Sequence, residues 1–352
     1  MLDKGRLHMS SPSKGEMPDQ VIPFLQKLDD PYGITWRIAN VFRRFNLRWF
    51  FHFGEGLLRS VHHERPIFII GLPRSGTTFL FHLLRESNEL AILEREGHDI
   101  WRLFHHPRYS DWDSDSVGQG EIRFGERRVV NAIFFAFAGT KRFVEKTADN
   151  CIRVPYLLEL FPDATFVVMK RNPCDVINSY INGWRHPLGR FRSYFVPDVL
   201  SIPDYPHRHR WCSTLIDGWR SFASAPIPEI AFAQWREYVQ FTVAARSLVP
   251  SSQWLELYFE DLLLHPEATT GNLYAKLRLH SEPRLEAKLV DLLSNPVNAL
   301  TPPGQDKWLH QNAREIKALL PRIAPLALQL GYNIDPATGE CEILRDTDVF
   351  VS

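Results

Sequence analysis

The chain has 352 residues, and its 41 basic and 41 acidic side chains give a formal net charge of zero. This balance argues against non-specific binding to nucleic acid, which depends on a basic surface. The longest uncharged apolar run covers residues 129–139, far fewer than the roughly 20 residues that cross a bilayer. We therefore expect a globular chain with no transmembrane segment and no nucleic-acid partner.

The N-terminal twenty residues and the cysteines bear on where the chain works. Residues 1–20 are polar and rich in Ser, Pro, Gly and Lys, so we expect a disordered tail and no secretory signal. The four cysteines are scattered without a C-x-x-C pair. These features predict a soluble, cytoplasmic protein with reduced thiols and no metal site.

A basic amphipathic helix is predicted next. Residues 34–50 place apolar side chains at helical spacing among four arginines. We expect residues 21–62 to form a helical segment packed on the main domain. A helix of this composition that lies on a membrane surface is the alternative.

From residue 63 onward, short apolar strands alternate with helices. The run at 66–70 is almost wholly apolar, which is typical of a parallel strand buried on both faces. We expect strands at 66–70, 143–146, 165–170 and 254–259, and helices from 77, at 152–161, after 173, and at 229–249, 266–279 and 311–330. This order predicts one three-layer α/β/α domain with a central parallel sheet over residues 63–335, followed by a tail at 336–352.

The loop after the first strand has the skeleton of a phosphate-binding P-loop. Gly71 and Gly76 are separated by four residues, and Thr77 stands where a nucleotide triphosphatase has its lysine. Backbone N–H groups and a helix N-terminus would still bind an anion, and Arg74 supplies a fixed cation. A P-loop kinase or nucleotide hydrolase is the main alternative, but the missing lysine opposes it.

Four segments in order resemble the PAPS-dependent sulfotransferases. Residues 73–78 (PRSGTT) resemble the 5′-phosphosulfate loop of bacterial members and of tyrosylprotein sulfotransferases. Residues 169–173 (MKRNP), with Ser179, resemble the family's 3′-phosphate element. Residues 258–262 (YFEDL) and 306–308 (DKW) resemble two further elements of the family. The resemblance implies a P-loop-like α/β fold and in-line transfer of a sulfuryl group from PAPS to a hydroxyl or amine, with release of PAP and without a metal.

The resemblance also assigns residues to the cofactor. The implied PAPS-binding residues are Arg74, Ser75, Gly76, Thr77, Thr78, Arg171, Ser179, Tyr258 and Lys307. Arg171 ends a predicted strand, where a guanidinium can bind a phosphate through two hydrogen bonds. Two departures leave the 3′-phosphate pocket partly assigned. Gly183 stands where the family often has arginine, with Arg185 as a substitute, and the Arg-Lys-Gly triplet of the cytosolic enzymes is absent.

The candidate catalytic residues are Lys146, Arg74 and one of three nearby bases. By the resemblance, Lys146 stabilises charge on the bridging oxygen as PAP leaves. Relatives carry a glutamate a little over twenty residues after the phosphosulfate loop, a window that holds Glu94 and Glu96 with His98 beside them. We favour Glu96 as the general base and keep Glu94 and His98 as alternatives.

The acceptor is less defined by the sequence. Richness in apolar residues, including 24 phenylalanines, favours a small-molecule or lipid-like alcohol over a charged polysaccharide. A non-catalytic nucleotide-binding module is a third functional hypothesis. The sequence makes no prediction of oligomeric state.

Overall fold

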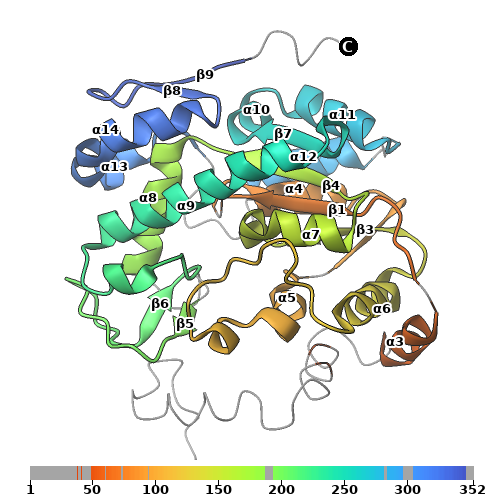
Figure 1. Cartoon of the computed structure of the whole chain (residues 1–352). Coiled ribbons are helices and arrows are strands. Elements are labelled where there is room, and N and C mark those ends of the chain that lie inside the picture. Colours follow the sequence, from red (N-terminus) through yellow and green to blue (C-terminus); the bar gives the residue numbers. More distant parts are fainter. Residues whose placement is uncertain are drawn as a thin grey trace, which may run out of the picture.

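The computed structural model describes residues 49–345, with gaps at 60, 73, 94, 187–192, 281–283 and 296–303, and two earlier residues, Ile38 and Val41. Its centre is a five-stranded sheet in the order β2-β3-β1-β4-β7, in which every neighbouring pair is parallel (Figure 1). The strands are β1 Ile67–Gly71, β2 Leu90–Ile92, β3 Arg142–Lys146, β4 Thr165–Lys170 and β7 Trp254–Tyr258.

The central strand explains why the sheet is covered on both faces. All five residues of β1 are buried, and successive side chains of a strand point to opposite faces. Ile67 and Ile69 belong to one hydrophobic cluster, whereas Phe68 and Ile70 belong to the other. An uninterrupted apolar strand therefore supplies two cores at once.

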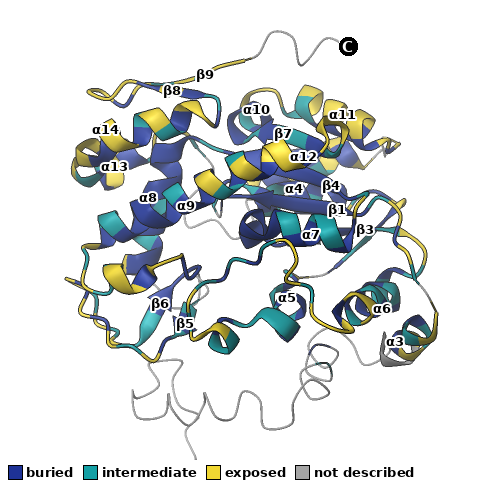
Figure 2. Cartoon of the chain, viewed as in Figure 1, coloured by how far each residue is buried: buried dark blue, intermediate teal, exposed yellow. Residues whose placement is uncertain are grey.

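Helices cover the two faces as separate layers. Side chains of α11 (Pro266–Leu277) and α12 (Leu285–Ser294) join the cluster that contains Ile67 and Ile69, and side chains of α6 (Glu126–Ala138) and α7 (Val154–Leu160) join the cluster that contains Phe68 and Ile70. Figure 2 shows that the sheet is buried, whereas α11 and α12 carry exposed residues on their outer sides. The predicted three-layer α/β/α fold with a central parallel sheet is confirmed.

The remaining elements extend the two layers. The helices are α3 Trp49–Leu58, α4 Thr77–Leu84, α5 His98–His105, α8 Pro173–Arg185, α9 Ile227–Leu248, α10 Phe259–Leu264, α13 Trp308–Gln311 and α14 Ala313–Leu328. Two antiparallel hairpins pair β5 Ser193–Phe195 with β6 Arg210–Cys212, and β8 Tyr332–Ile334 with β9 Cys341–Ile343. Short 3-10 turns are η2 Pro107–Ser110, η3 Ala148–Arg153, η4 Trp219–Phe222 and η5 Ser251–Gln253.

Several predicted boundaries moved for local reasons. The helix predicted at 152–161 is a 3-10 turn, η3, followed by α7. Pro155 has no N–H to give to a preceding turn, which favours a helix that starts beside it. The domain end predicted at residue 335 falls inside the β8–β9 hairpin, so the folded chain reaches at least Ile343.

The N-terminal predictions lie mostly outside the described residues. This holds for the tail at 1–20 and for nearly all of the amphipathic helix at 34–50. The helix that follows, α3, packs closely on α6, since a Cβ added to Gly56 would lie 3.0 Å from the Cα of Ala132. Among the helices that the structure describes, none is both long and apolar enough to cross a membrane.

Candidate active site

The candidate site lies at the carboxyl edge of the sheet. Because the strands are parallel, the segments that follow them meet at the same edge. The 72–76 loop follows β1, Lys146 ends β3, Arg171 follows β4 and Tyr258 ends β7. The chain places β3 and β4 on opposite sides of β1, so the loop stands where the strand order reverses, which is where open α/β sheets bind ligands.

The loop between β1 and α4 requires its glycines. Gly71 and Gly76 have φ angles of 147° and 98°, in a region that side chains rarely adopt. A Cβ on Gly76 would collide with the ring of Phe259, and one on Gly71 with the backbone of Met169. Arg74 also takes a left-handed conformation, with φ 78°. A non-glycine residue in this conformation is typical of functional loops.

Ser75 marks the inside of this loop. Its side chain is fully buried, and its Oγ has no hydrogen-bond partner among the described residues. A buried hydroxyl without a hydrogen-bond partner lowers the stability of the fold, and such a group commonly binds a ligand or a water molecule. Thr77 and Thr78 follow at the N-terminus of α4, where backbone N–H groups and the helix dipole favour an anion. The loop therefore fits a phosphate or sulfate group.

A second group of cations lies beside the loop. Arg74 Nε donates to Ser179 Oγ at 3.1 Å, and Arg171 Nη1 donates to the carbonyl of Arg74 at 3.1 Å. Arg171 Nη2 donates to the carbonyl of Gly304 at 3.1 Å, so Arg171 ties the loop to the segment that carries Lys307. Burial and the charges of Arg171 and Arg74 lower the pKa of Lys307. This excess of positive charge suits a second anionic group.

Two residues that the sequence did not single out support these cations. Asp175 accepts from the backbone N–H groups of Asp306 and Trp308, at 2.9 and 3.3 Å, and so fixes the position of Lys307 between them. The ring of Phe259 packs against Gly76, and the guanidinium of Arg171 lies 4.9 Å from its centre. The spacing of Asp175 from Arg171, one helical turn, was a usable signal. Phe259 offered none.

Lys146 and Glu96 form an ion pair on the other side of the loop. Lys146 Nζ donates a hydrogen bond to Glu96 Oε1 and a second one to Thr78 Oγ1, the latter at 3.1 Å. Glu96 Oε2 lies 2.8 Å from His98 Nε2. Lys146 is 6% exposed, so its charge is largely screened from water by the protein. The structure thus joins the end of β3, the segment after β2 and the first turn of α4.

The electrostatics of Glu96 follow from these contacts. Burial by itself would raise its pKa, but the hydrogen bond from His98 and the charge of Lys146 outweigh this and lower the pKa to about 2. Burial lowers the pKa of His98, and its contact with Glu96 only partly offsets that effect. At neutral pH Glu96 is therefore an ionised carboxylate beside Lys146.

Some predicted site residues are placed elsewhere or not described. The side chain of Tyr258 faces Lys170, whose Nζ lies 3.5 Å from the hydroxyl, and a Cβ on Gly331 would collide with that hydroxyl. Arg185 pairs with Glu315 at 2.8 Å, on α14. Glu94 lies outside the described residues. The cofactor roles of Tyr258 and Arg185, and Glu94 as an alternative general base, stay predictions.

Several aromatic and histidine side chains belong to the hydrophobic core or to its edges. Phe134 is fully buried and stacks on Phe143 with ring centres 4.1 Å apart. His105 Nε2 lies 2.9 Å from Glu126 Oε1, and both side chains are buried. In the described part of the chain, no group of three His, Cys, Asp or Glu side chains could hold a metal ion.

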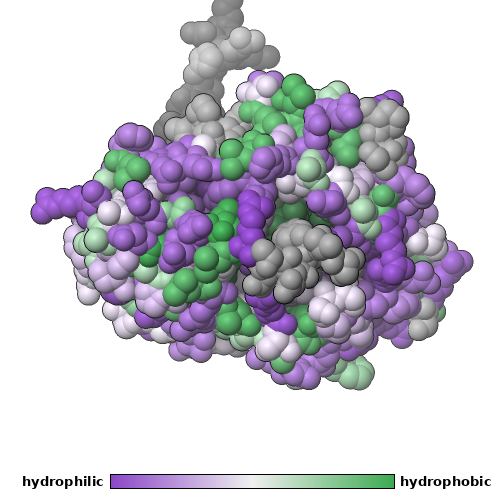
Figure 3. Space-filling model, turned by 90° about the horizontal axis from the view of Figure 1, so that it is seen from above, coloured by the Kyte–Doolittle hydropathy of each residue, from purple (hydrophilic) through white to green (hydrophobic). Residues whose placement is uncertain are grey.

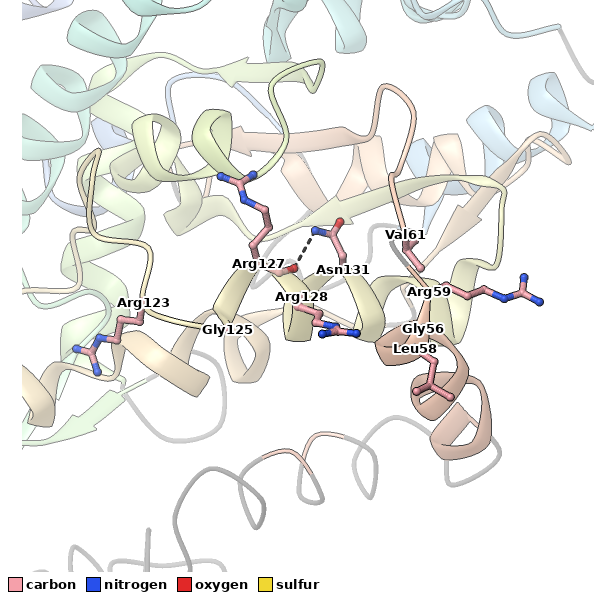
Figure 4. A pocket seen from close by; sticks show the side chains of 9 residues that line it. All are labelled: Gly56, Leu58, Arg59, Val61, Arg123, Gly125, Arg127, Arg128 and Asn131. Atoms are coloured by element: carbon pink, nitrogen blue, oxygen red, sulfur yellow. Dashed lines mark hydrogen bonds between the residues drawn. The ribbon is translucent and has the colours of Figure 1, made fainter.

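A separate pocket lies between α3 and α6. Its volume is about 550 Å³, and it is lined by Gly56, Leu58, Arg59, Val61, Arg123, Gly125, Arg127, Arg128 and Asn131. Figure 4 shows the arginine side chains pointing in different directions, so they do not converge on one ligand. Arg127 donates to the carbonyl of Leu160, shortly before β4 begins, which places this pocket away from the carboxyl edge.

Seen from above, the surface of the molecule is mostly hydrophilic, with apolar patches scattered among polar ones (Figure 3). Exposed apolar side chains on the described helices include Leu264, Val290 and Leu328, which belong to three different helices. Isolated apolar residues of this kind are normal on a protein surface.

Comparison with known proteins finds similarity to sulfotransferases. Residues 66–234 match the family model described as "Sulfotransferase family". The omega-hydroxy-beta-dihydromenaquinone-9 sulfotransferase Stf3 of Mycobacterium bovis is 23% identical over 300 residues, covering 68% of this chain and 70% of that protein. Protein-tyrosine sulfotransferase A of Caenorhabditis elegans is 24% identical over 294 residues, covering 76% of this chain and 67% of that protein.

A solved structure shares the fold. The crystal structure of sulfotransferase STF9 from Mycobacterium avium matches with a TM-score of 0.54 and 14% sequence identity, covering 85% of this chain and 84% of that one. The matched family region contains the phosphate-binding loop, the Lys146–Glu96 pair and Arg171. Residues 66–234 therefore match the sulfotransferase family, and Stf3 and protein-tyrosine sulfotransferase A, which match most of the chain, are themselves named as sulfotransferases.

Proposed function

We propose that the protein transfers a sulfuryl group from PAPS to a hydroxyl or amine of an acceptor and releases PAP. The observation that carries this proposal is the contact of Lys146 with both Thr78 of the anion-binding loop and Glu96. One side chain thereby connects the place for a phosphosulfate to a candidate general base. The P-loop lysine that a kinase would need is replaced by Thr77.

The residues present fit PAPS at both of its anionic ends. The 5′-phosphosulfate would be held by Arg74, Ser75, Gly76, Thr77 and Thr78, where the buried Ser75 hydroxyl has no partner among the described residues. The 3′-phosphate would be held by Arg171, Ser179 and Lys307, and Arg74, which donates to Ser179, would lie between the two anionic groups. When bound, PAPS supplies the sulfuryl group and, as PAP, the leaving group.

The two members of the ion pair have different tasks. Lys146 stabilises negative charge that develops beside the loop during transfer, and it is held there by Thr78. Glu96 takes the proton of the acceptor hydroxyl, since its carboxylate is ionised and lies next to Lys146. His98 orients Glu96 through its contact at 2.8 Å.

The acceptor that we propose is a small-molecule or lipid-like alcohol. Stf3 and protein-tyrosine sulfotransferase A are named for a menaquinone-type and a tyrosine hydroxyl, so hydroxyl acceptors of quite different size occur among the relatives. The apolar composition of this chain favours the former kind. A cytoplasmic location and a single sulfotransferase domain starting near residue 63 complete the proposal.

The cofactor assignment is tested by thermal stability with PAP and no added magnesium. At 100 times its dissociation constant, a ligand that binds only the folded state stabilises it by about 2.7 kcal/mol. We expect a clear rise in Tm with PAP. If Mg-ATP raises the Tm and PAP does not, the kinase hypothesis replaces this one.

Catalysis is tested by a screen of acceptors with radiolabelled PAPS. We expect label to appear on at least one phenol, aliphatic alcohol or quinol. If PAP binds but no acceptor of any class is labelled, the chain is a nucleotide-binding module.

A further inference from the structure

The general base sits on a segment that is fixed by a buried carboxylate. Glu145 is the residue before Lys146 on β3, and it is 0% exposed. Its Oε1 accepts from the backbone N–H of Gly97 at 2.9 Å, and its Oε2 accepts from Asn150 Nδ2 at 2.9 Å. The hydroxyl of Thr147 also donates to it. All three neighbours are donors, which is the arrangement that an ionised carboxylate needs.

The N–H of Gly97 belongs to the peptide group that joins Glu96 to Gly97. It donates to Glu145 and also to Thr147 Oγ1, each at 2.9 Å. Gly97 allows this approach because it has no side chain. A Cβ there would lie 2.8 Å from Glu145 Oε1 and 3.1 Å from Trp101 Nε1. The base is thus attached to the strand that presents Lys146, through one peptide group.

We propose that Glu145 is a positioning residue for the reaction: its carboxylate holds the Glu96–Gly97 peptide group, and with it the base, beside Lys146. This inference rests on the proposed function. Strand β3 then fixes the positions of both Lys146 and Glu96. Lys146 contacts the loop directly, and Glu145 positions Glu96 through the hydrogen bond with Gly97. Positioning of this kind is worth a large factor, since a shift of about 1 Å at a reacting group can cost about 100-fold in rate.

The burial of Glu145 predicts how activity depends on pH. Burial raises the pKa of Glu145 to about 7, and the hydrogen bonds from Thr147 and Gly97 offset only part of the rise. Among nearby charges, Glu96 raises this pKa and Lys146 lowers it. Below about pH 7 the Glu145 carboxyl becomes protonated, and the new O–H faces only hydrogen-bond donors. The hydrogen bond from the Gly97 N–H to Glu145 therefore weakens. Activity should then fall as the pH drops through about 7, a limb that Glu96, with its pKa of about 2, cannot produce.

A direct test follows the amide signal of Gly97 by NMR in full-length protein labelled with 15N-glycine. We expect this signal to titrate with a midpoint near pH 7 in the wild type and to lose that titration in Glu145→Gln. In Thr147→Val, which removes one donor to the carboxylate, the midpoint should move to higher pH. A Gly97 signal that does not respond to pH in the wild type overturns the proposal, and no acceptor is needed for this result.

The kinetic test uses the acceptor found in the screen. We expect Glu145→Gln to lower kcat about 100-fold, to leave the affinity for PAP within about twofold, and to abolish the acid limb near pH 7. Glu237→Gln is the matched control. Glu237 is also buried, accepts a backbone N–H, from Asp217 at 3.0 Å, and has a pKa raised by burial to about 8.

The outcomes separate the two claims. If Glu237→Gln loses the limb as well, or Glu145→Gln keeps it, Glu145 is only a structural residue and the inference fails. Should the limb disappear in His98→Ala instead, the titrating group is His98. If Gly97 titrates as expected but no acceptor is ever sulfated, the proposed function fails while the structural link stands.

Discussion

The two halves of the candidate site treat charge in opposite ways. On the β4 side, three cations, Arg74, Arg171 and Lys307, gather beside one buried carboxylate, Asp175, which lies 3.7 Å from Arg171. The charges of Arg171 and Arg74 contribute to the lowered pKa of Lys307. On the β3 side, Lys146 is matched by Glu96, which contacts His98 in turn. Excess positive charge suits binding of an anion that is the same before and after reaction. A paired cation and base suit chemistry in which charge moves.

This contrast separates binding from catalysis. Interactions made equally with the ground and transition states change affinity, whereas those made only in the transition state change kcat. We therefore expect substitutions on the β4 side to weaken PAP binding and those on the β3 side to lower turnover.

The largest expected effect is at Lys146. Lys146→Ala should lower kcat about 100- to 1,000-fold, the range typical of losing one electrostatic stabiliser. The affinity for PAP, measured by calorimetry, should stay near normal. Normal turnover in this variant would remove the lysine from the mechanism, and a parallel loss of PAP affinity would erase the contrast between the two sides.

The next effect is at the base. Glu96→Gln should reduce kcat by about 100-fold or more, because an amide cannot take the acceptor proton. His98→Ala is the companion variant and should cost less, since it removes only the contact that orients Glu96. Full activity in Glu96→Gln combined with loss in His98→Ala or Glu94→Gln would assign the base to one of those residues.

A smaller effect, on the affinity for PAP and less on kcat, is expected at Arg171. Arg171→Ala removes a charged donor from the cation group, and hydrogen bonds to charged groups are worth about 1.5–3 kcal/mol. The Kd for PAP should rise about 10- to 100-fold, with a smaller change in kcat at saturating PAPS. Arg322→Ala serves as the control, since its guanidinium, on α14, pairs with Glu229 on α9 at 2.8 Å. Equal losses in both variants would show that the effect is general destabilisation.

The smallest effect is on stability in acid. The pKa of Glu96 is lowered in the folded state, so its ion pair contributes stability that is complete above the unfolded pKa of about 4.5 and is lost as the pH falls towards about 2. Chemical denaturation between pH 5 and pH 2 should show a steeper loss for the wild type than for Glu96→Gln. Identical slopes would mean that the pair is too exposed to matter.

The fold was predictable where one rule governs a segment. The strand at 165–170 was placed at its observed bounds because its apolar residues are buried on both faces. Shorter or mixed elements were missed: β2 has three residues, and the β5–β6 hairpin joins segments with no hydrophobic alternation long enough to detect. The β8–β9 hairpin crosses a predicted domain boundary for the same reason.

The candidate site was predictable as a set of residues and not as an arrangement. The loop glycines, Arg74, Lys146 and Arg171 stand in motifs whose chemistry can be read from residue type and spacing. Glu145, Asp175 and Phe259 act through contacts with segments far away in the chain. Their neighbours there are Gly97, the 306–308 segment and Gly76, respectively. No local pattern records such a contact.

The sequence by itself determined the parallel α/β architecture and the presence of a P-loop-like glycine loop that lacks the P-loop lysine. Both depend on local rules, which are the apolar periodicity of strands and the backbone freedom of glycine. Only the tertiary structure decided that Lys146 meets Glu96 and that Arg74, Arg171 and Lys307 share one place. Parallel pairing of β2 with β3 sets Glu96 beside Lys146, across 50 residues of chain. Such pairing is fixed by the packing of the whole sheet, which no single segment encodes.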